Sequence, residues 1–345
     1  MTVAENILLT GAGFTHNFGG FLVERMWAEI FNHPDIQRSQ LIREWMLSDF
    51  NYESIYDKVL YEPSGRLFSG RDRDAIKTAV RAAYEKLDAS IIAFQRGHGN
   101  KVIALRGLLR LFAGDNNAAG LFFTLNQDIF IERFYDGYDK PLRLPGPGVQ
   151  EISLRLISSR WPQKLQDEDI ITLEKSVDTM SIKNSLSTSE FNYIKLHGSF
   201  NWRSSTGSDA MVIGMDKESS IDREPLLKSY LEIFREALSY PNRRLIIIGY
   251  SFRDKHINEV IKDAIENCGL RVIVVSAESP RQFVDKFLGV HGIRTQLPSE
   301  EYPFGETILS EGLTGYFPFE LNEDTIVTLA KNLFADREIK KDGFI

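Results

Sequence analysis

Cysteine is almost absent from this chain of 345 residues, which contains Cys268 and no other. A single thiol cannot form an intramolecular disulfide, and it cannot supply the thiolates of a cysteine-only zinc site. We therefore expect no metal site, and no zinc. The low cysteine content is typical of the reducing cytoplasm.

An excess of positive charge is also missing. The chain has 41 Lys and Arg residues against 48 Asp and Glu, which gives a formal net charge of −7. A free-standing nucleic-acid-binding protein needs cationic side chains to neutralise phosphates, so we expect no direct nucleic-acid partner.

Long hydrophobic runs are missing too. No apolar run approaches the roughly 20 residues of a membrane-spanning helix, and the first residues show no basic stretch followed by a long apolar segment. The sequence predicts a cytoplasmic protein with no signal peptide and no membrane partner.

Short apolar segments are present and predict buried β-strands at 7–10, 121–125, 191–196, 244–249 and 271–276. Continuous apolar runs bounded by glycine or polar residues are typical of a parallel sheet covered on both faces. Helical periodicity fills the intervals, for example from Ile257 to Cys268, where Gly269 suits a helix end. This alternation predicts an α/β fold, a Rossmann-like doubly wound parallel sheet.

A large helical insertion separates the first two predicted strands, because most residues between them have helical periodicity. We predict a nucleotide-binding core of residues 1–21 and 113–290, and a helical insertion of residues 22–112. Residues 291–345 are expected to form a C-terminal loop, over 291–306, and a helix, over 323–334, and are a candidate assembly segment. The Ser- and Thr-rich stretch 181–190 predicts an exposed loop.

A glycine pair, Gly11 and Gly13, follows the first predicted strand. Such a turn at a helix N-terminus lets the backbone approach a pyrophosphate, although a purely structural turn is the alternative. The dehydrogenase fingerprint fails because His16 occupies its third glycine position and no Asp or Glu ends a second strand about 20 residues further on. No Gly-Lys-Ser/Thr of a P-loop follows either.

Polar residues or glycine also follow three other predicted strands. Asn126 and Asp128 lie in "TLNQD", and His197 lies in "LHGS". If the strands are parallel, these loops meet at one edge of the sheet, where ligands bind. The structural alternatives are an Asx turn and a buried histidine without a chemical role.

The fourth strand is followed by "GYSFRD", which contains Gly249 and Ser251. Gly249 would allow close approach of the backbone to a ligand, and Ser251 could contact a phosphate. The alternative is that Ser251 and Asp254 form a capping box at the start of the next helix.

Taken together, the Gly-Ala-Gly turn, the Thr-x-Asn-x-Asp strand end, the Leu-His-Gly segment and the Gly-x-Ser turn resemble the sirtuin superfamily over residues 6 to about 280. Sirtuin deacylases carry a four-cysteine zinc module between the last two motifs, whereas residues 199–249 contain no cysteine. The stretches "GYSFRDKHIN" and "FNYESIYDKV" are closer to the zinc-free, sirtuin-like NADases of bacterial anti-phage defence.

That resemblance implies hydrolysis of NAD+, as a substrate, to nicotinamide and ADP-ribose. It implies that Asn126 orients a water molecule and the ribose hydroxyls, which suits an amide because it donates and accepts without charge. His197 would bind the ribose or accept a proton. The implied nucleotide-binding residues are Gly11, Ala12, Gly13, Phe14, Asn126, Asp128, Gly249, Ser251 and Ser276, with Glu278 near the adenosine half.

The resemblance also implies a homo-oligomer and a partner such as a HerA-like hexameric ATPase or an Argonaute-like protein. Two other functions stay open. The chain could be a sensor subunit that binds NAD or ADP-ribose without turnover, or an NAD-dependent protein deacylase. The sequence does not separate hydrolysis from cyclisation of the ADP-ribose product.

Overall fold

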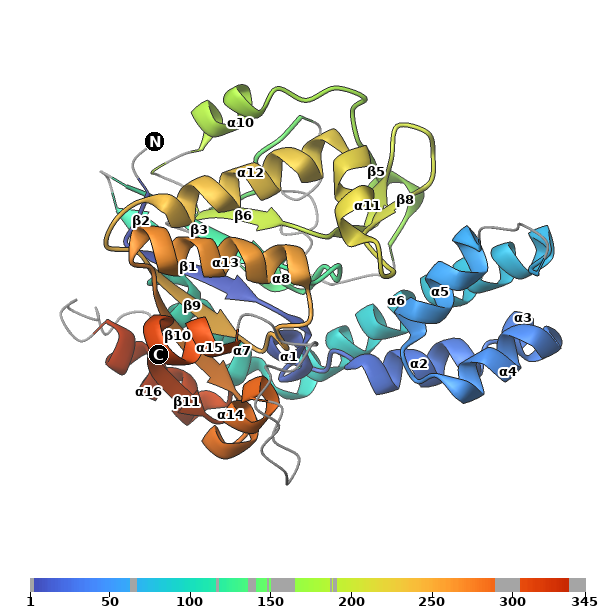
Figure 1. Ribbon diagram of the computed structural model, residues 1–345, viewed down its shortest axis with the longest axis horizontal. Coiled ribbons are helices and arrows are strands. Elements are labelled where there is room, and N and C mark those ends of the chain that lie inside the picture. Colours follow the sequence, from blue (N-terminus) through green and yellow to red (C-terminus); the bar gives the residue numbers. More distant parts are fainter. Residues whose placement is uncertain are drawn as a thin grey trace.

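A parallel β-sheet forms the centre of the molecule (Figure 1). The computed structural model describes residues 3–62, 67–115, 118–135, 141–147, 149, 165–186, 188, 191–288 and 305–334. The strands of the sheet, in spatial order, are β11 (Leu313–Pro318), β10 (Arg271–Ser276), β9 (Arg244–Ile248), β1 (Asn6–Thr10), β3 (Ala118–Thr124), β6 (Phe191–Lys195) and β4 (Leu142–Arg143). A short strand, β2 (Gly114–Asp115), pairs antiparallel with β3.

The strand order confirms the predicted Rossmann-like architecture. From β6 through β3, β1, β9 and β10 to β11, the order is that of a doubly wound dinucleotide-binding fold. All strands predicted from apolar runs are present. The sequence analysis missed β2 and β4, which have two residues each, and β11, whose Gly315 and Pro318 interrupt the apolar pattern and whose side chains are half-buried or exposed.

Helices cover both faces of this sheet. Successive residues of a strand point to opposite faces, and on β3 Phe122 contacts Phe14 of α1 (Ala12–His16), while Phe123 contacts Phe234 of α12 (Pro225–Ser239). On the α12 face, α13 (Lys255–Cys268) packs beside α12. On the other face, α7 (Gly99–Arg110) packs against α16 (Glu323–Leu333), and Phe112 contacts Phe334.

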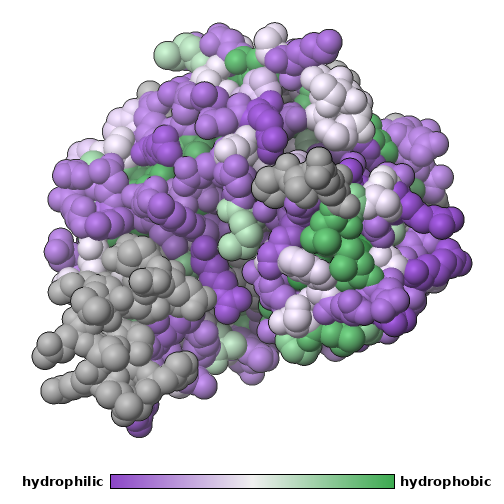
Figure 2. Space-filling view, turned by 45° about the vertical axis from the view of Figure 1, so that its right-hand side comes forward, coloured by the Kyte–Doolittle hydropathy of each residue, from purple (hydrophilic) through white to green (hydrophobic). Residues whose placement is uncertain are grey.

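A helical arm projects from the core on the right of Figure 1. It consists of α2 (Val23–Phe31), α3 (Pro34–Arg38), α4 (Gln40–Ser48), α5 (Tyr52–Tyr61) and α6 (Gly70–Gly97). Helix α6 has 28 residues, about 42 Å at the usual rise, so it runs from the tip of the arm into the core. Figure 2 shows a hydrophobic patch where the arm comes forward, and the exposed large hydrophobic residues of this region are Leu47, Phe50, Tyr61 and Leu67.

A second, small sheet lies beyond β6. It contains β5 (Ile171–Thr172), β7 (Gly198–Arg203) and β8 (Asp209–Met211), and the segment around it adds η1 (Asp167–Asp169), α10 (Thr179–Ser185) and α11 (Lys217–Arg223). The prediction of an exposed loop over 181–190 is wrong in its first half. Asp178 caps the N-terminus of α10 through its side chain, and Ile182 is buried, so the Ser-containing segment continues as helix to Ser185.

The C-terminal region begins with α14 (Pro280–Leu288), and most of the loop predicted at 291–306 lies outside the described residues. Its last two residues start α15 (Gly305–Thr307), which leads into η2 (Ile308–Gly312) and β11. The helix predicted at 323–334 is confirmed as α16. The predicted domain boundaries and an assembly role for 291–345 stay predictions.

Candidate active site

The loops that follow β1, β3, β6 and β9 lie at one edge of the sheet, because these strands are parallel and adjacent. Gly11, Asn126, His197 and Gly249 each come one or two residues after the end of a strand. The chain runs outward from β1 in both directions, through β3 on one side and β9 on the other, and ligands of doubly wound sheets bind at such a switch point. The predicted gathering of these loops is confirmed.

The two glycine-containing turns pack directly against each other. The Gly13 N–H donates to the Gly249 carbonyl over 2.9 Å. Gly249 has a φ of +64°, and a Cβ there would lie 2.2 Å from the Phe14 nitrogen. Glycine is therefore required at position 249 because the backbone of α1 approaches it closely, whether or not a ligand does so as well.

Little of the turn after β1 is free to bind a ligand. The Gly11 N–H donates to Ile248 and the Phe14 N–H to Gly11, whereas no hydrogen bond among the described residues uses the N–H of the exposed Ala12. The Phe14 side chain is buried among Phe18, Phe122 and Phe130 and cannot face a nucleotide. Any contact from Phe14 must come from its backbone.

Asn126 is fixed by its own amide group. Its Nδ2 donates to the Gly11 carbonyl over 3.0 Å and to Thr15 Oγ1 over 2.8 Å. Because the carbonyl can only accept, these bonds determine which way the amide points. Both N–H donors are used, and no described residue donates to Oδ1. Asn126 is 9% exposed, and its Oδ1 remains available as an acceptor.

Asp128, two residues after Asn126, is buried and has structural partners. Its Oδ1 accepts from the Phe130 N–H over 3.0 Å, and burial raises the pKa of its carboxyl group, while Lys195 and the Thr15 hydroxyl oppose that shift. Lys195 donates to the Asp128 backbone carbonyl and pairs with Glu132 at 2.7 Å. These contacts hold the loop after β3 in place.

His197 contacts a second histidine that the sequence analysis did not select. Its Nε2 lies 3.0 Å from Nε2 of His256, in the first turn of α13, and both side chains are 3% exposed. Burial lowers the pKa of His197 well below its usual value and that of His256 to about 4. Both rings are therefore neutral at pH 7.

An ion bridge from the helical arm reaches the histidine pair. Lys217 Nζ lies 2.8 Å from Oε2 of Glu53, on α5, and 2.7 Å from Oδ1 of Asp254, which directly precedes α13. Burial raises the pKa of Asp254, but the nearby Lys217 and His197 lower it by a larger amount, to about 2. Asp254 is thus an anion beside both histidines.

The arm also braces the loop that carries Asn126. Tyr84, on α6, donates to Oε1 of Gln127, and the Gln127 amide donates to the Val212 carbonyl over 2.7 Å. The motif "GYSFRDKHIN" was the available signal for Asp254 and His256. No local pattern marks Glu53, Lys217 or Tyr84, because they come from separate segments.

The remaining predicted residues lie at the same edge with different contacts. Ser251 is exposed, and the capping-box interpretation is wrong: Asp254 is itself the N-cap of α13, without a side-chain cap, because its carboxylate pairs with Lys217. Ser276, at the end of β10, is half-buried, and its hydroxyl accepts from the Glu278 N–H over 3.2 Å.

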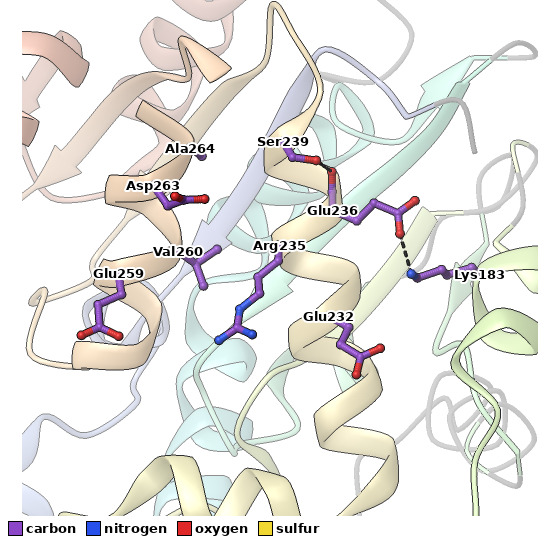
Figure 3. A pocket seen from close by; sticks show the side chains of 9 residues that line it. All are labelled: Lys183, Glu232, Arg235, Glu236, Ser239, Glu259, Val260, Asp263 and Ala264. Carbon is purple, nitrogen blue, oxygen red and sulfur yellow. Dashed lines mark hydrogen bonds and ion pairs between the residues drawn. The ribbon is translucent and has the colours of Figure 1, made fainter. Parts of the chain in front are cut away.

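A surface cavity of about 600 Å³ lies elsewhere, between α12 and α13 (Figure 3). It is lined by charged side chains, and a 2.5 Å ion pair joins Lys183 to Glu236 at its rim. None of the predicted site residues lines it. Arg235, one of its lining residues, lowers the pKa of His256 through its charge. We place the candidate site at the sheet edge, where the predicted residues lie.

The model of the SIR2-like domain matches residues 120–295, about half of the chain, which include Asn126, His197, Gly249 and His256. No curated protein matches the chain. In the described part of the chain, no helix has the length and hydropathy to span a bilayer, and no His, Cys, Asp and Glu side chains group as metal ligands there.

Proposed function

The chain belongs to the SIR2-like family, whose domain points to the use of NAD+, and we propose that it hydrolyses NAD+ at the nicotinamide–ribose bond. The products would be nicotinamide and ADP-ribose. The observation that carries this proposal is Asn126: both amide N–H groups are bound to the turn after β1, and Oδ1 is left as an acceptor at the switch point of the sheet.

The chemistry of the bond explains why so few groups are needed. Nicotinamide leaves as a neutral molecule because the pyridinium nitrogen takes the bonding electron pair, and the ribose C1′ becomes an oxocarbenium-like centre. The protein has to orient the ribose, exclude bulk water and position one water molecule against C1′. Asn126 Oδ1 would accept a hydrogen bond from that water or from a ribose hydroxyl, and His197 would accept one on its imidazole.

The biological setting is a proposal on the same basis. The resemblance of "GYSFRDKHIN" to defence NADases supports a role in depleting NAD+ during phage infection, in the cytoplasm. A homo-oligomer and a HerA-like ATPase or Argonaute-like partner would then control the activity. The cysteine-free segment between Ser199 and Gly249 argues against protein deacylation.

The decisive test compares wild type with Asn126→Ala in an etheno-NAD cleavage assay, with candidate partners present and products identified by chromatography. We expect the variant to lose at least about a hundredfold in rate, because a group aimed at the reacting centre is removed. Product identification separates hydrolysis from cyclisation.

The matched control is Asn267→Ala, an exposed asparagine near the end of α13, which should cleave at the wild-type rate. Cleavage at the wild-type rate by Asn126→Ala would refute the assignment. Tight binding of NAD+ without turnover would identify a sensor subunit, and activity on an acetyl-peptide would identify a deacylase.

A further inference from the structure

The contact between His197 and His256 has a direct consequence for the proposed site. Their Nε2 atoms are 3.0 Å apart and the ring centroids 5.1 Å apart. At this distance nothing fits between the two nitrogens, and a hydrogen bond joins them.

The hydrogen in this bond belongs to His256. Burial lowers the pKa of His197, but the backbone of Leu125 opposes that shift, as an accepting carbonyl does, and the Leu125 N–H already donates to Thr10. Since Nε2 of His197 is bonded to His256, a hydrogen shared with that carbonyl belongs to Nδ1 of His197. Nε2 of neutral His197 is then an acceptor, and His256 must donate from its own Nε2.

The lone pair on Nε2 of His197 is therefore already in use. An imidazole nitrogen accepts one hydrogen bond in its ring plane, and the proposed function requires that lone pair for a ribose hydroxyl or for water. We propose that His256 competes with the substrate for Nε2 of His197, so that this site is held in a closed state until the two rings separate. This inference rests on the proposed function.

The elements around His256 provide the means to hold the closed state. Among the described residues, the charged groups that shift the pKa of the two rings are Asp254, which precedes α13, Lys217 at the start of α11, and Arg235 on α12. Lys217 binds Asp254 and also Glu53 on α5. The first turn of α13, with His256, is thereby tied to the helical arm, and a displacement of the arm would loosen it.

The test measures binding of ADP-ribose by calorimetry alongside cleavage of etheno-NAD. His256→Phe keeps a ring and removes the donor, and we expect its Kd for ADP-ribose to fall about threefold to tenfold, the worth of one neutral hydrogen bond. His256→Gln keeps an N–H donor and should lie nearer to wild type. If His256→Phe does not fold, His256→Ala serves as a second variant without a donor.

Two further variants make the result specific. Glu53→Gln leaves both histidines in place and should also lower the Kd for ADP-ribose. In the double variant its effect should not add to that of His256→Phe, since both substitutions act on one contact. Lys255→Ala, an exposed neighbour in the same turn, is the control and should bind like wild type.

The outcomes separate the two proposals. Suppose that the wild type cleaves NAD+ but folded His256→Phe binds ADP-ribose no more tightly than the wild type. This result would refute the competition and leave the proposed NAD+ hydrolysis standing. If no folded variant binds ADP-ribose or cleaves NAD+, with partners present, the proposed function fails and the competition fails with it.

Discussion

Gly11, Gly13 and Thr15 connect three strands within a few residues. Gly13 bonds to Gly249 after β9, while Gly11 and Thr15 hold the amide of Asn126 after β3. A change in this turn therefore acts on two neighbouring loops at once. At the scale of single residues, the candidate site depends on backbone contacts as much as on side-chain chemistry.

Gly249→Ala tests this dependence on stability. A Cβ at this position adds a backbone clash to a left-handed conformation, so we expect the free energy of unfolding to fall by about 3 kcal/mol or more. The control is Gly269→Ala, with a similar φ of +68° and no atom within 4 Å of the added Cβ, which should lose only about 1 kcal/mol. Equal losses in chemical denaturation would show that the contact with α1 is unimportant.

At the scale of elements, the helical arm is anchored to the core by buried polar contacts. Asp88 on α6 forms a two-point ion pair with Arg133 of α8 (Phe130–Phe134), with both N···O distances at 2.7 Å, and both side chains are almost fully buried. The Glu53–Lys217 pair and the Tyr84–Gln127 hydrogen bond lie nearer the site. The arm is therefore part of the site's framework.

Asp88→Ala should destabilise the protein by about 3–5 kcal/mol, because it removes the carboxylate that forms two bonds to the buried Arg133 guanidinium. Replacing both residues, as Asp88→Leu with Arg133→Met, should recover much of that loss. Glu259→Ala, which breaks the exposed Lys255–Glu259 pair, should cost less than about 0.5 kcal/mol. Thermal and denaturant unfolding of the three variants measure these differences, and a small loss for Asp88→Ala would contradict the anchoring role.

At the scale of the whole molecule, one doubly wound sheet brings together residues from distant parts of the chain. Gly11, Asn126, His197 and Gly249 come from four strand ends, and Glu53 arrives from the arm. The site is thus inseparable from the fold, and its titrating groups affect global stability.

The buried histidines make stability depend on pH. The pKa of His256 is about 4 in the folded protein, against about 6.5 in an unfolded chain, so between these values the unfolded state binds more protons. Its contribution to the free energy of unfolding is present above pH 6.5 and is lost as the pH falls towards 4, at about 1.4 kcal/mol per pH unit. Denaturation of wild type and His256→Phe over this range should give a shallower slope for the variant. Parallel slopes would refute the buried neutral state.

The sequence by itself determined five strands of the central sheet and the location of the candidate site. Strands buried on both faces are mostly apolar, so β1, β3, β6, β9 and β10 could be predicted from the sequence, and Asn126 and His197 closely follow two of them. Helical periodicity likewise determined α13 and α16, because each buries one face.

Only the tertiary structure decided what those residues contact. Asp254 looked like part of a helix cap, but Lys217 takes its carboxylate, and Gly249 is required by the backbone of α1. His256, Lys217 and Glu53 meet although they are far apart in sequence. Ion pairs and hydrogen bonds between separate segments leave no local periodicity, so packing alone brought the helical arm to His197.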